Sequence, residues 1–194
     1  MDILERAGRL KAEADYLMQE IRLYEILLSC ASVTPTGSYF LDVMVYPDID
    51  LYISRVSIEQ LFHIAGQLAQ SELVIAVVFE KSADPRLPGG LYLKPRLAWG
   101  EWGRPWKIDI WSLEASLIEQ NLQTMRHFKE NMTPYLREQI LRYKISIMTP
   151  SQRPPPYSGY FIYKAFIDEG MVDFQQVTGY LLSQGIQMAP AALV

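Results

Sequence analysis

The chain has 194 residues, of which 49% are hydrophobic and 21% are charged, and its formal net charge is −4. This composition is typical of a globular protein and excludes a largely disordered one, and the length fits one domain with an appendage or two small lobes. The acidic balance argues against a large nucleic-acid footprint, because binding a polyanion normally requires a clustered excess of Lys and Arg. We therefore expect small-molecule partners.

The sequence also indicates the compartment. Cys30 is the only cysteine, so neither an internal disulfide nor a thiolate cage for zinc can form within the chain. The most apolar segment, Leu73 to Phe79, is much shorter than the roughly 20 residues that a membrane span requires. We expect a soluble cytoplasmic protein with no membrane contact.

The first 30 residues predict one long helix. Apolar residues recur at alternating steps of four and three and form a single stripe, namely Ile3, Ala7, Leu10, Ala14, Leu17, Ile21, Tyr24 and Leu28. Such a stripe could be a coiled-coil seam through residues 3–28 of a homodimer, or it could pack against its own domain. We favour the second interpretation, with Pro35 ending the helical region.

A predicted strand from Val43 to Ile53 follows the pair Gly37 and Ser38. Because side chains alternate along a strand, Asp48 and Asp50 point to one face and the intervening aliphatic residues point to the other. Two carboxylates on one face repel each other unless water or a cation compensates them. This pattern therefore indicates a metal site.

Three further segments predict strands. Leu73 to Phe79 is almost uninterruptedly apolar, which is typical of a strand covered on both faces. Leu91 to Trp99 contains Pro95, which favours a sheet edge or a bulge. A hairpin then leads to Trp106–Trp111, in which alternation places Lys107 and Asp109 on one face.

The remaining segments predict helices. Ser57 followed by Gln60 is a capping box that begins a helix, and Thr133 followed by Pro134 begins another. Between these two, a third helix begins near Ser112. Two short helices at the end of the chain cover about residues 160–169 and 173–183. We therefore expect an α+β protein with a mixed-sheet domain over residues 1–111 and a helical C-terminal lobe over residues 112–194.

The order of these acidic residues resembles a known family. Gly37-Ser38, then Asp48-Ile49-Asp50-Leu51, and a later strand with Asp109 between apolar neighbours are similar to the signature of the nucleotidyltransferase superfamily, whose catalytic domain is shared with DNA polymerase beta. The resemblance implies a mixed β-sheet domain flanked by helices. It covers Gly37 to Trp111.

The resemblance also implies a chemistry. A nucleoside monophosphate would pass from a nucleoside triphosphate, expected to be ATP, to a hydroxyl of a small acceptor, with Asp48, Asp50 and Asp109 holding Mg²⁺ or Mn²⁺. The Gly37-Ser38 turn would hold phosphate oxygens. Lys94, Arg96 and Lys107 are weaker candidates for the triphosphate.

Two other hypotheses remain open from the sequence. The chain could be a catalytically inactive member of the same fold that binds nucleotides or a partner protein. Alternatively, the three aspartates could be solvated strand residues of an unrelated α+β domain.

Overall fold

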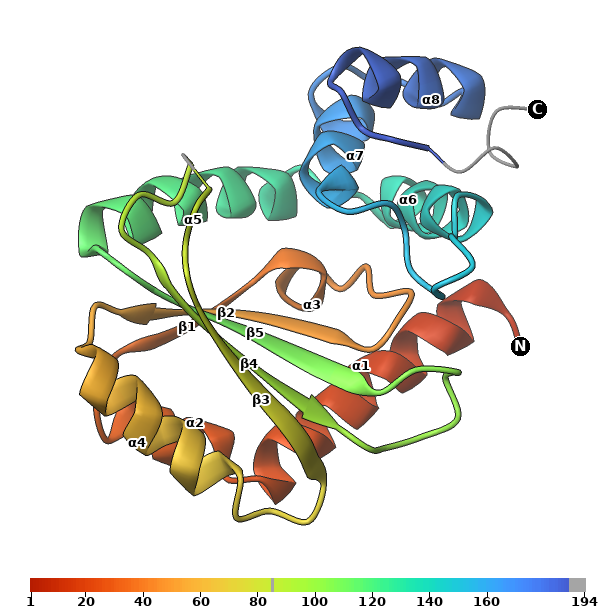
Figure 1. The fold of residues 1–194 in the computed structure, drawn as a ribbon. Helices are drawn as coiled ribbons and strands as arrows, with labels where there is room; N and C mark the ends of the chain where they lie inside the picture. The colour runs from red at the N-terminus through yellow and green to blue at the C-terminus, as the bar shows by residue number, and fades with distance from the viewer. Residues whose placement is uncertain (85, 189–194) are drawn as a thin grey trace.

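The computed structural model describes residues 1–84 and 86–188, which contain a mixed sheet of five strands with helices on both faces (Figure 1). The strands lie in the order β1-β2-β5-β4-β3, with the bounds β1 Val33–Thr36, β2 Asp48–Ser54, β3 Val74–Lys81, β4 Leu91–Leu97 and β5 Trp106–Leu113. The helices are α1 Ile3–Glu20, α2 Leu23–Leu28, α3 Gly37–Leu41, α4 Ile58–Leu68, α5 Ala115–Glu130, α6 Pro134–Ser146, α7 Ser158–Ile167 and α8 Phe174–Ser183. The predicted α+β class with a mixed sheet is confirmed.

The centre of the sheet is the only parallel pair among the described strands. β2 and β5 run parallel, whereas β1 with β2, β5 with β4 and β4 with β3 are antiparallel. The predicted hairpin between β4 and β5 is therefore confirmed. In the central pair Asp50 lies opposite Asp109, and Asp48 lies opposite Lys107.

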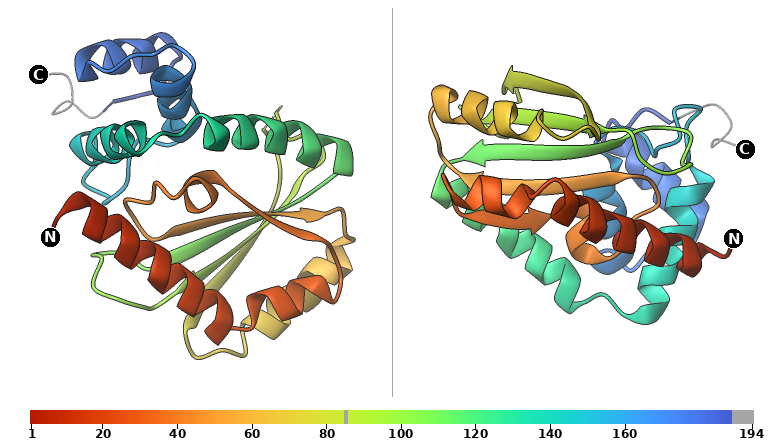
Figure 2. Two further views of the ribbon diagram at one scale, coloured as in Figure 1. Left: turned by 180° about the vertical axis from the view of Figure 1, so that it is seen from behind. Right: turned by 90° about the horizontal axis from the view of Figure 1, so that it is seen from below.

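One face of the sheet is the main apolar core. The aliphatic residues of β2 and β5 alternate with the polar ones and are fully buried, namely Ile49, Leu51, Ile53, Ile108 and Ile110. Figure 2 shows α1, α2 and α4 covering this face. Each such side chain contributes roughly 1.5–3 kcal/mol through burial, so this face fixes the direction in which the intervening polar side chains point.

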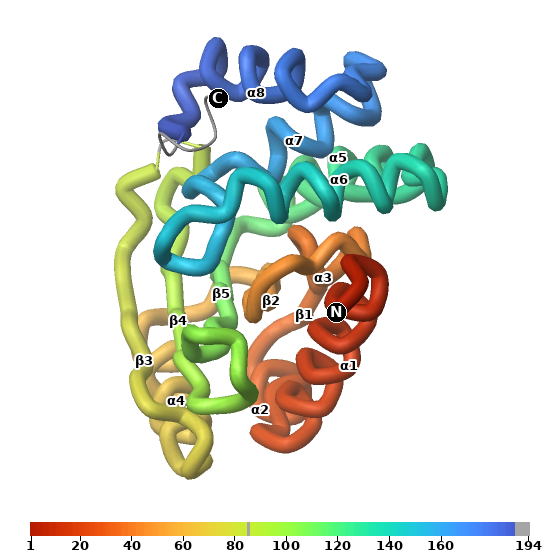
Figure 3. Tube along the Cα trace, turned by 90° about the vertical axis from the view of Figure 1, so that its right-hand side faces the viewer, coloured from red at the N-terminus to blue at the C-terminus, as the bar shows by residue number. Residues whose placement is uncertain are grey.

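The opposite face lies under the remaining helices. A second apolar cluster joins α6, α7 and α8 to Leu41, the last residue of α3, and to Val43 and Val45, which lie between α3 and β2. Figure 3 shows this helical layer on one side of the sheet, with the chain between α6 and α7 passing close to the strands. The polar face of β2 and β5 therefore looks into the space between sheet and helices.

The N-terminal helix is interrupted where the apolar stripe predicts continuity. Arg22 has φ +53° and separates α1 from α2. The stripe residues Leu10, Ala14 and Leu17 are fully buried in the main core of their own chain. The interpretation that the stripe packs against its own domain is the one that the structure shows, and these side chains cannot also form a coiled-coil seam.

Two predictions near the site need correction, namely the turn at Gly37-Ser38 and the start of the strand that follows it. Residues Gly37–Leu41 form a helix, and β2 begins at Asp48 and not at Val43. The segment between them is apolar because Val43 and Val45 are buried in the second cluster, not because they alternate within the sheet. Pro35 lies within β1, opposite Leu51.

The predictions for β3 and β4 need correction, because β3 is not covered on both faces and β4 is not at the edge of the sheet. β3 is an edge strand, and its Ile75 is 57% exposed. β4 is an interior strand that tolerates Pro95 because the ladder to β5 has no pairs at residues 94 and 95. One face of β3 still packs on α4, where the Phe62 and Phe79 ring centroids are 5.1 Å apart.

The helix-capping predictions are confirmed. Ser57 and Gln60 form the full capping box of α4. Thr133 caps α6 with Pro134 in its first turn, and Asp173 caps α8. Within the described part of the chain, no helix combines the length and hydropathy that crossing a bilayer requires.

Candidate functional site

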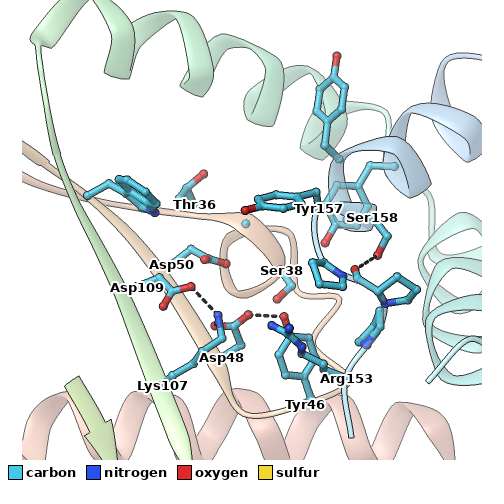
Figure 4. Close-up of a pocket in the computed structure, with 18 of the residues that line it drawn as sticks. Thr36, Ser38, Tyr46, Asp48, Asp50, Lys107, Asp109, Arg153, Tyr157 and Ser158 are labelled. Carbon is cyan, nitrogen blue, oxygen red and sulfur yellow. Dashed lines mark hydrogen bonds and ion pairs between the residues drawn. The ribbon is translucent and has the colours of Figure 1, made fainter. Parts of the chain in front are cut away.

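The three predicted aspartates converge on the polar face of the sheet. Asp48 and Asp50 come from β2 and Asp109 comes from the neighbouring parallel strand β5, and one carboxylate oxygen of each lies within 4.8 Å of the others. Figure 4 shows the three carboxylates side by side. The convergence follows from the side-chain alternation on two strands whose register places Asp50 opposite Asp109.

Gly37 and Ser38 lie directly beside this cluster. Gly37 has φ +61°, and a Cβ atom built on it would lie 2.2 Å from Oδ2 of Asp50. Only glycine allows both the left-handed backbone and this close approach. Ser38 is buried in the first turn of α3 and lines the same space.

A lysine ammonium lies between two of the carboxylates. Nζ of Lys107 is 2.8 Å from Oδ1 of Asp48 and donates a hydrogen bond to Oδ2 of Asp109 (Figure 4). Two tyrosine hydroxyls complete the arrangement, because Tyr46 donates to Asp48 and Tyr92 donates to Oδ1 of Asp109 at 2.5 Å. Asp50 has no hydrogen-bond donor among the described residues.

Burial and mutual repulsion dominate the electrostatics of the cluster. Burial raises the pKa of Asp48, Lys107 opposes this rise, and the net pKa lies above its usual value. Burial and the charges of Asp48 and Asp109 raise the pKa of Asp50 well above its usual value. Burial lowers the pKa of Lys107, but the three carboxylates outweigh it and raise the net pKa. The Lys107 ammonium alone therefore does not neutralise the three carboxylates.

These residues fit a hard divalent cation. The donors are three carboxylates, the ligand type that Mg²⁺ and Mn²⁺ prefer. Oδ1 of Asp48 is buried, and the Lys107 ammonium at 2.8 Å is its partner. Asp50 has neither a hydrogen-bond donor nor an ion pair among the described residues. A carboxylate in a buried cluster without such a partner is expensive unless a ligand satisfies it. The ligand type and the lack of a partner for Asp50 both favour a metal.

The cluster opens into a cavity of about 730 Å³ between the sheet and the helical layer. This size lies within the range of small-molecule and cofactor sites. The segment Arg153–Ser158, between α6 and α7, forms one wall (Figure 4). Tyr157 in this segment has φ +63°, is 71% exposed, and has the Arg86 guanidinium 5.1 Å from its ring centroid.

The structure separates the three basic residues predicted for the triphosphate. Lys94 lines the cavity, on the same face of β4 as Tyr92. Arg96 lies two residues further along the strand, is exposed, and does not line the cavity. Lys107, which is on the correct face for a phosphate contact, is paired with carboxylates instead.

Lys144 of α6 is the main cavity residue that sequence reasoning missed. It is 2% exposed, and its Nζ donates to the Val43 carbonyl at 2.6 Å and to the Tyr163 hydroxyl at 3.3 Å. Burial lowers the pKa of Lys144 to about 8, although Asp48 and Asp50 act in the opposite direction. The sequence contains a signal for the burial of Lys144. This residue follows the apolar Ile140 by four residues and so lies on the same face of the helix, which is buried.

Comparison with known proteins bears on the fold. No protein-family model matches the sequence, and no curated protein matches it. Among solved structures, a mutant of the Cid1 poly(U) polymerase bound to MgATP has a TM-score of 0.52 and 15% sequence identity, over 73% of this chain and 45% of that one.

Two other structures are similar. A Cid1 structure concerned with RNA terminal uridylyl transferase activity has a TM-score of 0.49 and 17% identity, over 80% of this chain and 45% of that one. A cytoplasmic RNA terminal U-transferase has a TM-score of 0.47 and 15% identity, over 72% of this chain and 41% of that one. The chain spans less than half the length of these proteins. The MgATP-bound match shows that the chain has the nucleotidyltransferase fold, which confirms the resemblance at the level of fold.

Proposed function

We propose that this chain, which has the nucleotidyltransferase fold, transfers a nucleoside monophosphate from a nucleoside triphosphate to a hydroxyl of a small acceptor. The observation that carries the proposal is the convergence of Asp48, Asp50 and Asp109 at the floor of one cavity. Three carboxylates without sufficient counter-charge form a metal site, and a metal site beside a cavity of nucleotide size suits phosphoryl chemistry.

The aspartates would hold Mg²⁺ or Mn²⁺. Asp48 and Asp50 would contribute to both ions of a two-ion site, and Asp109 would complete the one nearer to the acceptor. Such ions neutralise the phosphate charge and stabilise the attacking and leaving oxygens. The Tyr46 and Tyr92 hydroxyls fix the orientation of two of the three carboxylates, which is the role that outer hydrogen-bond partners have in metal sites.

The chain offers several groups to the triphosphate. Gly37 lets the backbone approach closely, and Ser38 presents a hydroxyl beside Asp50. Lys94 and Lys144 supply positive charge from opposite walls of the cavity. The N-terminus of α7 also lines the cavity at Ser158 and Gly159, and the partial positive charge of a helix N-terminus favours phosphate.

The proposed reaction forms one bond and breaks one. The acceptor oxygen bonds to the α-phosphorus while the bond from that phosphorus to the oxygen bridging the β-phosphate breaks, and pyrophosphate leaves with that oxygen. The proton of the acceptor hydroxyl passes to a carboxylate of the cluster, for which we propose Asp109. Positioning and charge neutralisation supply most of the rate.

A second candidate acceptor is the end of an RNA chain. The structural neighbours are poly(U) polymerases and an RNA terminal U-transferase. In this chain Arg86 and Arg153 line the cavity, where they could meet an acceptor phosphate. The net charge of −4 favours the small acceptor instead.

The experiment uses each nucleoside triphosphate labelled in its α-phosphate, with Mg²⁺ or with EDTA. Parallel reactions contain hydroxylated small molecules or a single-stranded RNA oligonucleotide. We expect Mg²⁺-dependent transfer of label and release of pyrophosphate, with Asp50→Asn inactive. Glu72→Gln, which neutralises an exposed carboxylate away from the cavity, is the control and keeps activity.

The outcomes separate the candidates. Label on a small molecule supports the proposal, and label on RNA supports the second candidate. Nucleotide binding by calorimetry that requires neither Mg²⁺ nor Asp50, with no transfer to any acceptor, supports the inactive binding module. Absence of both binding and transfer contradicts the proposal.

A further inference from the structure

Lys107 has an unusual position for a residue that faces a metal site. Its ammonium touches Asp48 and Asp109, which are carboxylates of two different strands, and all three side chains are at most 14% exposed. A cation that bridges two carboxylates of the cluster has the same neighbours that a bound metal ion would have. The ammonium thus occupies space in which carboxylate oxygens would meet an ion.

The charges in the cluster explain why the ammonium lies there. Three carboxylates within 4.8 Å of one another repel strongly in a buried setting, and a cation between them relieves part of that repulsion. Lys107 belongs to the same strand as Asp109 and shares its face, so its side chain reaches the cluster without distorting β5. Asp50 remains outside this pair and has no ion-pair partner in the described part of the chain.

We propose that Lys107 is an internal counter-ion that occupies the metal site of the nucleotide-free protein and must be displaced before a divalent ion binds. This inference rests on the proposed function, because it assumes that the three carboxylates take a metal. It makes Lys107 a determinant of metal affinity. Free metal then binds weakly, and a metal ion brought in by the nucleotide gains an advantage because the triphosphate attracts the displaced ammonium.

The test compares Mn²⁺ binding by the wild-type protein, Lys107→Met and Lys94→Met without nucleotide. Lys94 is the matched control, because it lines the same cavity and has no carboxylate at ion-pair distance among the described residues. Isothermal titration gives the affinity, and thermal unfolding in EDTA and in Mn²⁺ gives a second readout that needs no catalysis.

We expect Lys107→Met to bind Mn²⁺ at least about tenfold more tightly than the wild type, since a neighbouring charge commonly changes such equilibria by that factor or more. In EDTA it should unfold at a lower temperature, because its carboxylates have lost their counter-ion. Added Mn²⁺ should raise that temperature by more than it does in the wild type. Lys94→Met should resemble the wild type in both measurements.

Equal or weaker Mn²⁺ binding by Lys107→Met, while the wild type binds, overturns this inference alone and makes Lys107 a positioning residue for the carboxylates. Absence of Mn²⁺ binding in all three proteins overturns it together with the proposed metal chemistry. If Lys107→Met does not fold in either condition, Lys107→Gln, which keeps a polar side chain, is held to the same criteria.

Discussion

Gly37 and Asp50 are in such close contact that no other residue fits at position 37. A Cβ atom at Gly37 would lie 2.2 Å from Oδ2 and 2.9 Å from Cγ of Asp50. The backbone at Gly37 is also left-handed, with φ +61°. The turn that begins α3 therefore abuts the carboxylate that lacks both a hydrogen bond and an ion pair within the described residues.

We expect Gly37→Ala to abolish Mn²⁺ binding and transfer, because the methyl group must displace the Asp50 carboxylate or the turn itself. Gly89→Ala is the control, since Gly89 has a similar φ of +67° but nothing within 4 Å of the added Cβ. Both variants bear the cost of a left-handed alanine, about 1 kcal/mol. Titration with Mn²⁺ measures the effect of the contact with Asp50, and thermal unfolding measures the cost of the left-handed alanine. Equal losses of Mn²⁺ affinity in Gly37→Ala and Gly89→Ala would contradict the role of the contact.

Asp50→Asn should stabilise the metal-free protein at neutral pH. The native pKa of Asp50 lies above its usual value, so the native state binds more protons than the unfolded state between the two pKa values. Metal-free stability is therefore greatest below the unfolded pKa of about 4 and falls as the pH rises through the native pKa. Asparagine removes this loss.

The measurement is urea unfolding of both proteins in EDTA at pH 4.5 and pH 8, as an estimate of the free energy of unfolding by linear extrapolation. The advantage of Asp50→Asn should grow with pH, and Mn²⁺ should stabilise the wild type only. A wild-type protein that is more stable than Asp50→Asn at pH 8 in EDTA would mean that Asp50 has a compensating partner.

The candidate site could be predicted largely because it depends on local rules. The period of two along a strand places Asp48 and Asp50 on the same face of their strand, and Lys107 and Asp109 on the same face of theirs, whatever the strands pair with. The order of these residues then matches one family. The ammonium of Lys107 between the carboxylates could not be foreseen, because it depends on the register that places it opposite Asp48.

The arrangement of the strands depends on tertiary structure and was predicted less well. An apolar run such as Leu73–Phe79 indicates burial, but the strand order decides that β3 is at the edge. Pro95 favours an edge by its missing N–H group, but two omitted ladder pairs make it acceptable in an interior strand. Likewise, Val43 and Val45 are apolar because the helical lobe covers them.

A pair of identical substitutions tests whether one face of β3 is uncovered. Ile75 is 57% exposed, whereas Ile108 of β5 is fully buried. We expect Ile75→Ala to lower the free energy of unfolding by less than about 1 kcal/mol, and Ile108→Ala to lower it by about 2–5 kcal/mol. Urea unfolding measures both, and equal losses would show that β3 is covered on both faces.

Lys144 should give the protein a stability that rises at alkaline pH. Its native pKa is about 8, against an ordinary value of 10.5, because the ammonium is buried. Below pH 8 the lysine is charged in both states and the native state bears the full cost of burying the charge. Between pH 8 and 10.5 the native state loses its proton first, so the unfolded state binds more protons and stability rises with pH.

The quantity to measure is the free energy of unfolding of the wild type minus that of Lys144→Met, at pH 7.5 and at pH 10. It should increase by about 3 kcal/mol at most, since each pKa unit corresponds to about 1.4 kcal/mol. Lys129→Met is the matched control, because exposed Lys129 also donates to a backbone carbonyl at 2.6 Å, that of Phe40. It controls for the loss of an ammonium that makes the same kind of hydrogen bond at the surface. If the Lys144→Met difference does not change with pH, the Lys144 ammonium remains charged in the native state across this range, and Asp48 and Asp50 compensate for its burial.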